Sequence, residues 1–183
     1  IVRHHTDIYR RLRNTLRFLL GNLAGFDETE RLPVEDMPEL DRWVLHRLSE
    51  LDGKVRQACV DYEFHPLFTE LHTFCSVDLS AFYFDIRKDA LYCERDDSIK
   101  RRAVRTVLDE VFSCLTAWLA PFICFTAEEA WLARFPVESE GVHLRLFPDI
   151  PADWQDDALA AKWSKIRELR RVVTGALEIE RAE

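Results

Sequence analysis

The chain has 183 residues, of which 48% are hydrophobic and 32% are charged, and its formal net charge is −8. This composition fits one globular domain, with or without an appendage, and its acidic balance argues against a protein that binds nucleic acid through total charge alone. No apolar run approaches the ~20 residues that span a bilayer, so we expect no membrane partner.

Apolar residues recur at a spacing near 3.6 along most of the chain, which is typical of amphipathic helices. The predicted helices cover, in chain order, residues 6–23, 38–62, 66–92, 98–119, 126–134 and 156 onward. Residues 25–37 form an acidic connection, and residues 137–152 read as an extended segment. Long helices with short links predict an all-α, antiparallel helix bundle, with a short extended crossing segment and a further C-terminal helix.

We therefore divide the chain into a helical bundle over 1–135, an extended connection over 136–155 and the start of a C-terminal helical extension over 156–183. The chain begins at Ile1, has Met37 as its only methionine and stops inside a predicted helix, so we expect both ends to be fragment boundaries. The five cysteines are scattered without a Cys-x-x-Cys pair. They indicate neither a disulfide framework nor a zinc knuckle, and they favour a reducing, cytoplasmic location.

Two predicted helices carry polar residues with an expected structural role. Asp78 falls on the apolar stripe of the third helix, where a carboxylate must have a partner because an unpaired buried charge is very costly. The segment Thr126-Ala-Glu-Glu129 matches a capping box, in which a hydroxyl and a later carboxylate satisfy each other's exposed amides. We predict that Thr126 and Glu129 start the fifth helix.

No arrangement of residues indicates catalysis. His65 and His72 could share a helix face, but no third ligand lies at metal-binding spacing. The adjacent carboxylates Glu128 and Glu129 serve a helix start rather than acid–base chemistry, and Gly-rich phosphate loops and nucleophile motifs are absent. We predict no catalytic residue, no metal site and no cofactor in this chain.

The first predicted helix carries a basic stripe. Arg10, Arg13, Asn14 and Arg17 share one face because their spacing is i, i+3, i+4 and i+7. Guanidinium groups bind phosphates through paired donors and stack on bases, so this face is a candidate RNA-binding surface. In the alternative interpretation the arginines pair with the acidic segment 27–41 or with neighbouring helices, and spacing alone does not distinguish the two.

A second candidate surface lies at the end of the third predicted helix, where two aromatic rings stand beside two cations. Its residues are Tyr83, Arg87, Lys88 and Tyr92. Such a combination suits unstacked bases, although the same side chains could pack on the core through their rings and aliphatic stems. The basic run at the start of the fourth predicted helix adds Arg101 and Arg102 to the RNA-binding candidates.

Five segments resemble one family, in the family's own order, between about residues 5 and 150. They are Tyr9-Arg-Arg-Leu-Arg-Asn-Thr-Leu-Arg-Phe18, Asp41-Arg-Trp-Val-Leu-His-Arg-Leu48, Leu79-Ser-Ala-Phe-Tyr-Phe-Asp-Ile86, Phe125-Thr-Ala-Glu-Glu-Ala-Trp131, and Val142-His-Leu144 with Phe147-Pro148. Together they resemble the anticodon-binding domain of isoleucyl-tRNA synthetases, which are class Ia aminoacyl-tRNA synthetases.

The resemblance implies a fragment that recognises the anticodon stem-loop of tRNA(Ile), binds no DNA, and contacts the catalytic and C-terminal domains of its parent. Full-length members charge tRNA(Ile) with isoleucine, using ATP with Mg²⁺, and carry zinc in a C-terminal module. Their His-Ile-Gly-His and Lys-Met-Ser-Lys-Ser type signatures are absent here, so the fragment is expected to have no ligase activity. Arg13, Asn14 and Arg17 match the family's Arg-Asn-Thr-x-Arg pattern, and Asp78 would organise the bundle.

Two other interpretations stay open. The related valyl-, leucyl- and methionyl-tRNA synthetases have bundles of the same architecture, although the segments at 13–18 and 79–83 favour isoleucine. A different class of protein is a helical interaction module without RNA binding, which would hold a partner through the acidic segment 27–41.

Overall fold

The computed structural model describes residues 2–136 and 140–182, and within these ranges the chain is helical and contains no strand. The all-α prediction is therefore confirmed. The elements are α1 (Val2–Asn22), η1 (Val34–Asp36), α2 (Glu39–Asp61), α3 (Phe64–Thr73), η2 (Phe74–Phe84), α4 (Asp85–Tyr92), α5 (Ile99–Leu119), α6 (Cys124–Arg134), η3 (Val142–Leu144), η4 (Ala152–Trp154) and α7 (Asp157–Ala182). The predicted fragment boundaries at residues 1 and 183, and residues 137–139 of the predicted extended segment, lie outside the described ranges. None of the described helices is long and apolar enough to cross a membrane.

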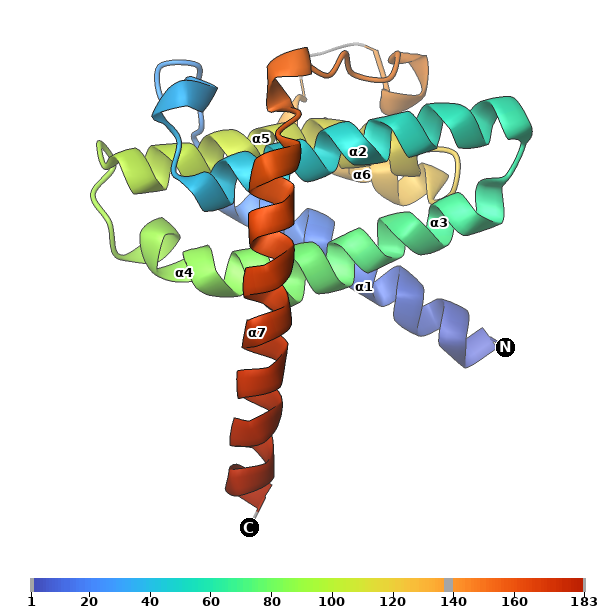
Figure 1. Ribbon diagram of the computed structural model, residues 1–183. Coiled ribbons are helices and arrows are strands. Elements are labelled where there is room, and N and C mark those ends of the chain that lie inside the picture. The colour runs from blue at the N-terminus through green and yellow to red at the C-terminus, as the bar shows by residue number, and fades with distance from the viewer. Residues whose placement is uncertain (1, 137–139, 183) are drawn as a thin grey trace.

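The bundle is built from α1, α2, α5 and one continuous rod made of α3, η2 and α4, and successive rods run in opposite directions (Figure 1). α5 lies in the middle, where it contacts α1, α2, α4 and α6. Its buried residues include Val104, Val107, Leu108 and Val111 on successive turns. Every residue from Ala103 to Leu108 and from Cys114 to Leu119 is buried, so neighbouring elements cover all sides of these turns, as expected of a central helix.

α1 buries one stripe of leucines and leaves its opposite face open. Leu12, Leu16, Leu19 and Leu23 are at most 2% exposed, at the spacing that lines one side of a helix. Gly25 follows the helix with φ +70°, a left-handed conformation that glycine adopts without strain and that commonly ends helices. The open face of α1 is therefore held in a fixed orientation by the packed one.

Residues 74–84 depart from the regular helix that their apolar spacing predicts, because they form a π-helix. Three successive side chains, Phe82, Tyr83 and Phe84, are buried there. Phe84 stacks on Phe18 of α1 with ring centroids 4.2 Å apart, and Phe82 meets Trp43 of α2 edge-on at 5.5 Å. Its exposed positions include the apolar residues Val77 and Ala81, so the sequence carries no clear polar face from which exposure could be predicted.

The predicted capping box at the start of α6 is wrong. The helix begins at Cys124, so Thr126 lies inside its first turn, and the Ala127 amide already bonds the Ile123 carbonyl at 2.9 Å. The helix thus runs through the position that the Thr126 hydroxyl was expected to cap, and that hydroxyl bonds the Tyr9 hydroxyl at 2.9 Å instead. Glu129 is exposed and does not complete a box.

The segment between α6 and α7 crosses the bundle as expected, with the short turns η3 and η4 along it. Glu128 of α6 accepts the Val142 amide at 2.7 Å, and Trp154 of η4 is buried beside α2. These contacts fix both ends of the crossing. The division of the chain at 135 and 155 stays a prediction.

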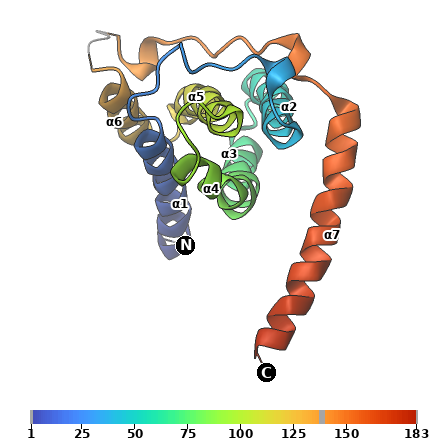
Figure 2. The ribbon, with the colours of Figure 1, turned by 90° about the vertical axis from the view of Figure 1, so that its left-hand side faces the viewer.

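α7 crosses α2 and continues well past the bundle (Figures 1 and 2). Its first turns are anchored, because Leu159 is buried and the Trp163 ring lies 6.4 Å from that of Trp43. Its later apolar residues are exposed: Leu169, Val172, Val173, Leu177 and Ile179. The bundle therefore holds only the first part of this helix.

We expect the stability of the fold to fall in alkali, partly through Cys75. Burial raises the pKa of its thiol from 9.0 to about 12. The pKa of this thiol is higher in the folded than in the unfolded chain, so only the unfolded chain releases the proton above about pH 9. The stabilisation that is present below that pH is therefore lost as the pH rises toward the folded-state pKa. The loss amounts to up to about 1.4 kcal/mol of unfolding free energy per pH unit.

Urea unfolding at about pH 8 and about pH 10 measures this loss. A Cys75→Ala variant should lose less stability between the two pH values than the parent does. Cys93→Ala, which removes an exposed thiol, is the matched control and should behave as the parent. Equal losses in all three proteins would contradict the role of Cys75.

Candidate nucleic-acid interface

The open face of α1 presents the predicted basic stripe to solvent. Arg10, Arg13, Asn14 and Arg17 are all exposed. Arg10 has one exposed partner, Asp7, at 3.3 Å. Over residues 2–136 and 140–182, Arg13 and Arg17 form no ion pair with another side chain, and the side chain of Asn14 forms no hydrogen bond. The stripe thus offers free donors along about 10 Å of helix.

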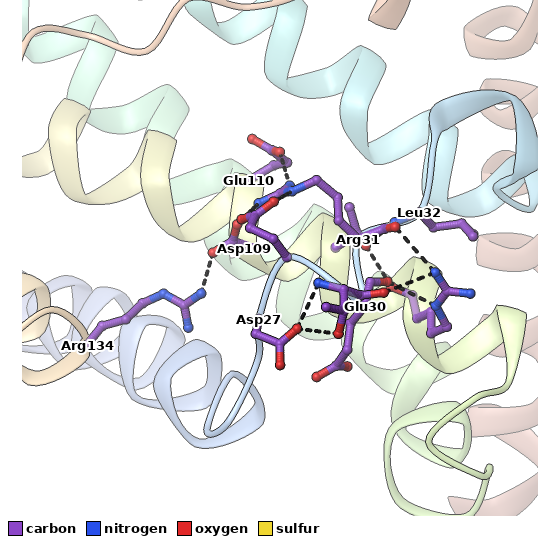
Figure 3. A network of polar contacts seen from close by, with 11 residues as sticks. Asp27, Glu30, Arg31, Leu32, Asp109, Glu110 and Arg134 are labelled. Atoms are coloured by element: carbon purple, nitrogen blue, oxygen red, sulfur yellow. Dashed lines mark hydrogen bonds and ion pairs between the residues drawn. The ribbon is translucent and has the colours of Figure 1, made fainter.

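The acidic residues of the loop after α1 do not pair with Arg13 or Arg17, because other arginines neutralise them (Figure 3). Arg31 lies between the loop and α5, where it pairs with Glu28 at 2.6 Å and with Asp109 and Glu110 at 2.5 Å each. Arg105 pairs with Glu30 at 2.8 Å. The alternative pairing of α1 with the segment 27–41 is therefore wrong for the loop acids in this network.

The contacts of this network shift the pKa values of some of its carboxyl groups. The Thr29 hydroxyl and amide donate to Asp27 and hold its pKa below the usual value. Burial raises the pKa of Glu110, which the neighbouring Arg31 opposes. The guanidinium groups of Arg31, Arg105 and Arg134 each lie 5.6–5.7 Å from the Phe26 ring centroid, within the range of cation–π attraction. The contacts of this loop connect α1 with α5 and α6.

Arg102 and Arg101 form contacts within the domain and do not form a free basic surface. Arg102 donates to the carbonyls of Glu30 at 3.1 Å and Arg31 at 3.4 Å. Arg101 pairs with Asp96 at 2.6 Å, and its side chain is only 18% exposed. Both were predicted to bind RNA; their donors hold a loop and a helix end in this structure, and their contact with RNA stays a prediction.

Tyr83 and Arg87 are likewise turned inward. Tyr83 is 0% exposed, and its hydroxyl donates to Asp41 of α2 at 2.6 Å. Arg87 pairs with both oxygens of the same carboxylate, with Nε at 3.1 Å from Oδ1. Burial raises the pKa of the Tyr83 hydroxyl well above its usual value. The prediction that these two residues contact bases is wrong, because they form a buried cluster between η2, α4 and α2.

Lys88 and Tyr92 remain on the surface of α4. Lys88 pairs with Asp85 at 3.0 Å, and both side chains are about half exposed. Tyr92, the last residue of the helix, is 66% exposed. Of the two predicted aromatic rings, only Tyr92 can therefore offer a face to a ligand.

The structure brings Tyr92 together with the stripe on α1. An open hollow of about 430 Å³ is lined by Tyr92 and by Asn14, Arg17, Phe18, Gly21 and Asn22 of α1. The sequence analysis placed Arg17 and Tyr92 on separate surfaces and missed Phe18, Gly21 and Asn22. Gly21 lies four residues after Arg17, so the helical spacing already carried that signal.

Comparison with known proteins identifies the family to which the chain belongs. Residues 41–183 match the family described as the anticodon-binding domain of tRNA ligase. The chain belongs to this family. The matched residues include Tyr92 and begin after α1, so the stripe on α1 precedes the matched region.

Individual relatives are isoleucine–tRNA ligases. The chain is 55% identical to those of Agrobacterium fabrum and Mesorhizobium japonicum over all of its length, and 55% identical to that of Caulobacter vibrioides over 97% of it. It spans only 18–19% of the length of these relatives. The anticodon-binding domain described here thus corresponds to about a fifth of each of them.

Asp78 is the remaining predicted structural residue of the anticodon-binding domain. It is buried in η2 and has two partners, Arg47 of α2 at 3.2 Å and Arg167 of α7 at 2.6 Å. The expectation that this carboxylate is paired is met. Because its partners come from two other helices, Asp78 joins α7 to the bundle.

Proposed function

We propose that this domain binds the anticodon stem-loop of tRNA(Ile) as part of an isoleucine–tRNA ligase. The observation that supports this most directly is the exposed stripe of Arg13, Asn14 and Arg17, whose donors have no ion-pair partner among the described residues. The identity to isoleucine–tRNA ligases along the whole chain supports the choice of amino acid and tRNA.

The chemistry of the stripe fits a splayed loop better than a duplex. Side chains cannot read the deep, narrow major groove of an A-form stem, whereas unstacked loop bases present their edges and faces. The arginines would contact phosphates and supply affinity that falls with salt. The amide of Asn14 and the ring of Tyr92 would supply contacts to bases, which carry the selectivity.

The parent of this domain would carry the chemistry. We propose that it charges tRNA(Ile) with isoleucine in the cytoplasm, using ATP with Mg²⁺ in a catalytic domain and carrying zinc in a C-terminal module. The exposed apolar residues on the later turns of α7, such as Val172 and Ile179, suit packing against another part of such a protein. The domain's own residues would only position the tRNA.

Charge reversal on the stripe tests the proposal. The Arg13→Glu/Arg17→Glu variant should bind an anticodon hairpin at least about tenfold more weakly, because each charged hydrogen bond contributes about 1.5–3 kcal/mol. The salt dependence should fall by about 0.7 in slope per lost phosphate contact. A fluorescence titration at two salt concentrations measures both, and the thermal midpoint should stay nearly unchanged because both side chains are exposed.

Lys165→Glu provides a matched control on α7, which stands on the opposite side of the bundle from α1 (Figure 2). It should bind as the parent does. A panel of hairpins that differ only in the anticodon then tests specificity, and preference for the isoleucine anticodon is expected. Equal affinity for every hairpin would contradict an anticodon reader, and wild-type affinity in the double variant would contradict the role of the stripe.

A further inference from the structure

The end of α1 is held by cations that α1 itself does not supply. The last turn of this helix has no basic residue, although the free carbonyls at a helix C-terminus attract positive charge. Arg134 of α6 donates to the Leu23 carbonyl at 3.3 Å. Arg105 of α5 donates to the Ala24 carbonyl at 3.2 Å. Side chains from α5 and α6 therefore cap the helix that carries the basic stripe.

Both capping arginines meet at one aromatic ring, that of Phe26. The guanidinium groups of Arg105 and Arg134 lie 5.6 and 5.7 Å from its ring centroid. Arg31 of the loop lies 5.7 Å from the same centroid. Cations that are close to one another repel, so they gather where a π face and carboxylates attract them. The Phe26 ring thus holds together cations that come from the loop, α5 and α6.

Carboxylates fix the direction of the two capping guanidinium groups. Arg105 pairs with Glu30 at 2.8 Å, and Arg134 pairs with Asp109 at 2.5 Å (Figure 3). Each group therefore divides its planar fork of donors between a carboxylate and a carbonyl at the end of α1, and it also lies over the Phe26 ring. The end of α1 thus has a defined place relative to α5 and α6.

We propose that Phe26 is a positioning residue for RNA binding, because its ring keeps together the arginines that set the place of the α1 end. The inference rests on the proposed function and adds a residue that acts without touching the RNA. Arg17 lies about 9 Å of helix before Leu23, so a shift of the α1 end also moves this part of the stripe. Donors that are in place before binding lose less freedom when the RNA arrives.

The test measures the affinity of the whole chain for a hairpin RNA that carries the anticodon loop of tRNA(Ile). Phe26→Leu keeps an apolar side chain but removes the π face, and it should bind the hairpin about three- to tenfold more weakly. Phe26→Tyr keeps the ring and should bind within about twofold of the parent. In the Arg13→Glu/Arg17→Glu background, Phe26→Leu should have no further effect, because it acts only through the placement of those arginines.

Arg134→Lys tests the same cluster from α6. Lysine keeps the positive charge but lacks the planar fork, so it cannot serve the Leu23 carbonyl, the Asp109 carboxylate and the ring together. It should weaken hairpin binding as Phe26→Leu does, and only while the stripe on α1 is intact. Circular dichroism at the temperature of the titration shows that each variant is folded, so a change in affinity is separate from a change in stability.

Phe122→Leu is the matched control, because Phe122 is also partly buried and its ring packs on those of Phe64 and Phe68. It should bind the hairpin as the parent does. If the arginine reversal weakens binding but Phe26→Leu and Arg134→Lys bind as the parent, or weaken binding equally with and without the stripe, the positioning role of Phe26 is wrong and the proposed function stands. If no hairpin binds the parent at low salt, the proposed function fails, and Phe26 has no such role.

Discussion

The Asp41→Ala variant is expected to lose about 3–5 kcal/mol of unfolding free energy, because it breaks a buried ion pair and leaves one partner charged. Asp41 is 0% exposed, accepts the Tyr83 hydroxyl at 2.6 Å and pairs with Arg87 through both oxygens. Without the carboxylate, the guanidinium and the hydroxyl have no acceptor in the space between α2 and α4. Urea unfolding followed by circular dichroism measures the loss.

Two further variants show whether the loss comes from the buried pair. Asp97→Ala removes an equivalent carboxylate from an exposed pair with Arg95 and should cost about 0–1 kcal/mol. The double variant Asp41→Leu/Arg87→Met removes both charges together and should recover much of the stability, since apolar replacements of buried pairs are often neutral. An Asp41→Ala protein as stable as Asp97→Ala would show that the cluster contributes nothing.

The helix order was predictable because each amphipathic helix carries its own signal. The leucine stripe and Gly25 define α1, and acidic first-turn residues follow Pro38 at the start of α2. These signals lie within each helix's own sequence, so they can be recognised without knowing which other helices pack against it. The start of α6 was missed because a helix can run through a Thr that matches a cap, as Thr126 shows.

The site was predictable only where exposure followed from spacing. The stripe on α1 lies opposite its leucines, so its exposure was fixed by the helical period. Tyr83 and Tyr92 look alike in sequence, but the π-helix and the carboxylate of Asp41 turn one ring inward. Arg102 donates to a loop carbonyl, whereas Arg17 lines an open hollow. This difference depends on contacts between segments that are distant in the sequence, so the sequence did not reveal it.

Asp78 should be the second most sensitive position, because its carboxylate joins three helices. The Asp78→Ala variant removes the acceptor of Arg47 at 3.2 Å and of Arg167 at 2.6 Å, and we expect a loss of about 3 kcal/mol. The effect should be larger on α7 than on the bundle, since Arg47 retains its ion pair with Glu50. Hydrogen exchange resolved by segment should show faster exchange over residues 157–170 than in the parent.

Arg167→Ala separates the attachment of α7 from the stability of the bundle. Asp78 then keeps Arg47, so the bundle should unfold near the parent's midpoint, while α7 should exchange about as fast as in Asp78→Ala. Arg171→Ala, which removes an exposed arginine of the same helix that forms no ion pair with a described residue, is the control and should leave α7 protected. If α7 stays equally protected in all three variants, the packing of Trp163 on Trp43 and Phe82 holds the helix without the ion pair. The direction in which α7 leaves the bundle would then depend on that aromatic contact, on the buried Leu159 and on the ion pair of Lys162 with Glu39.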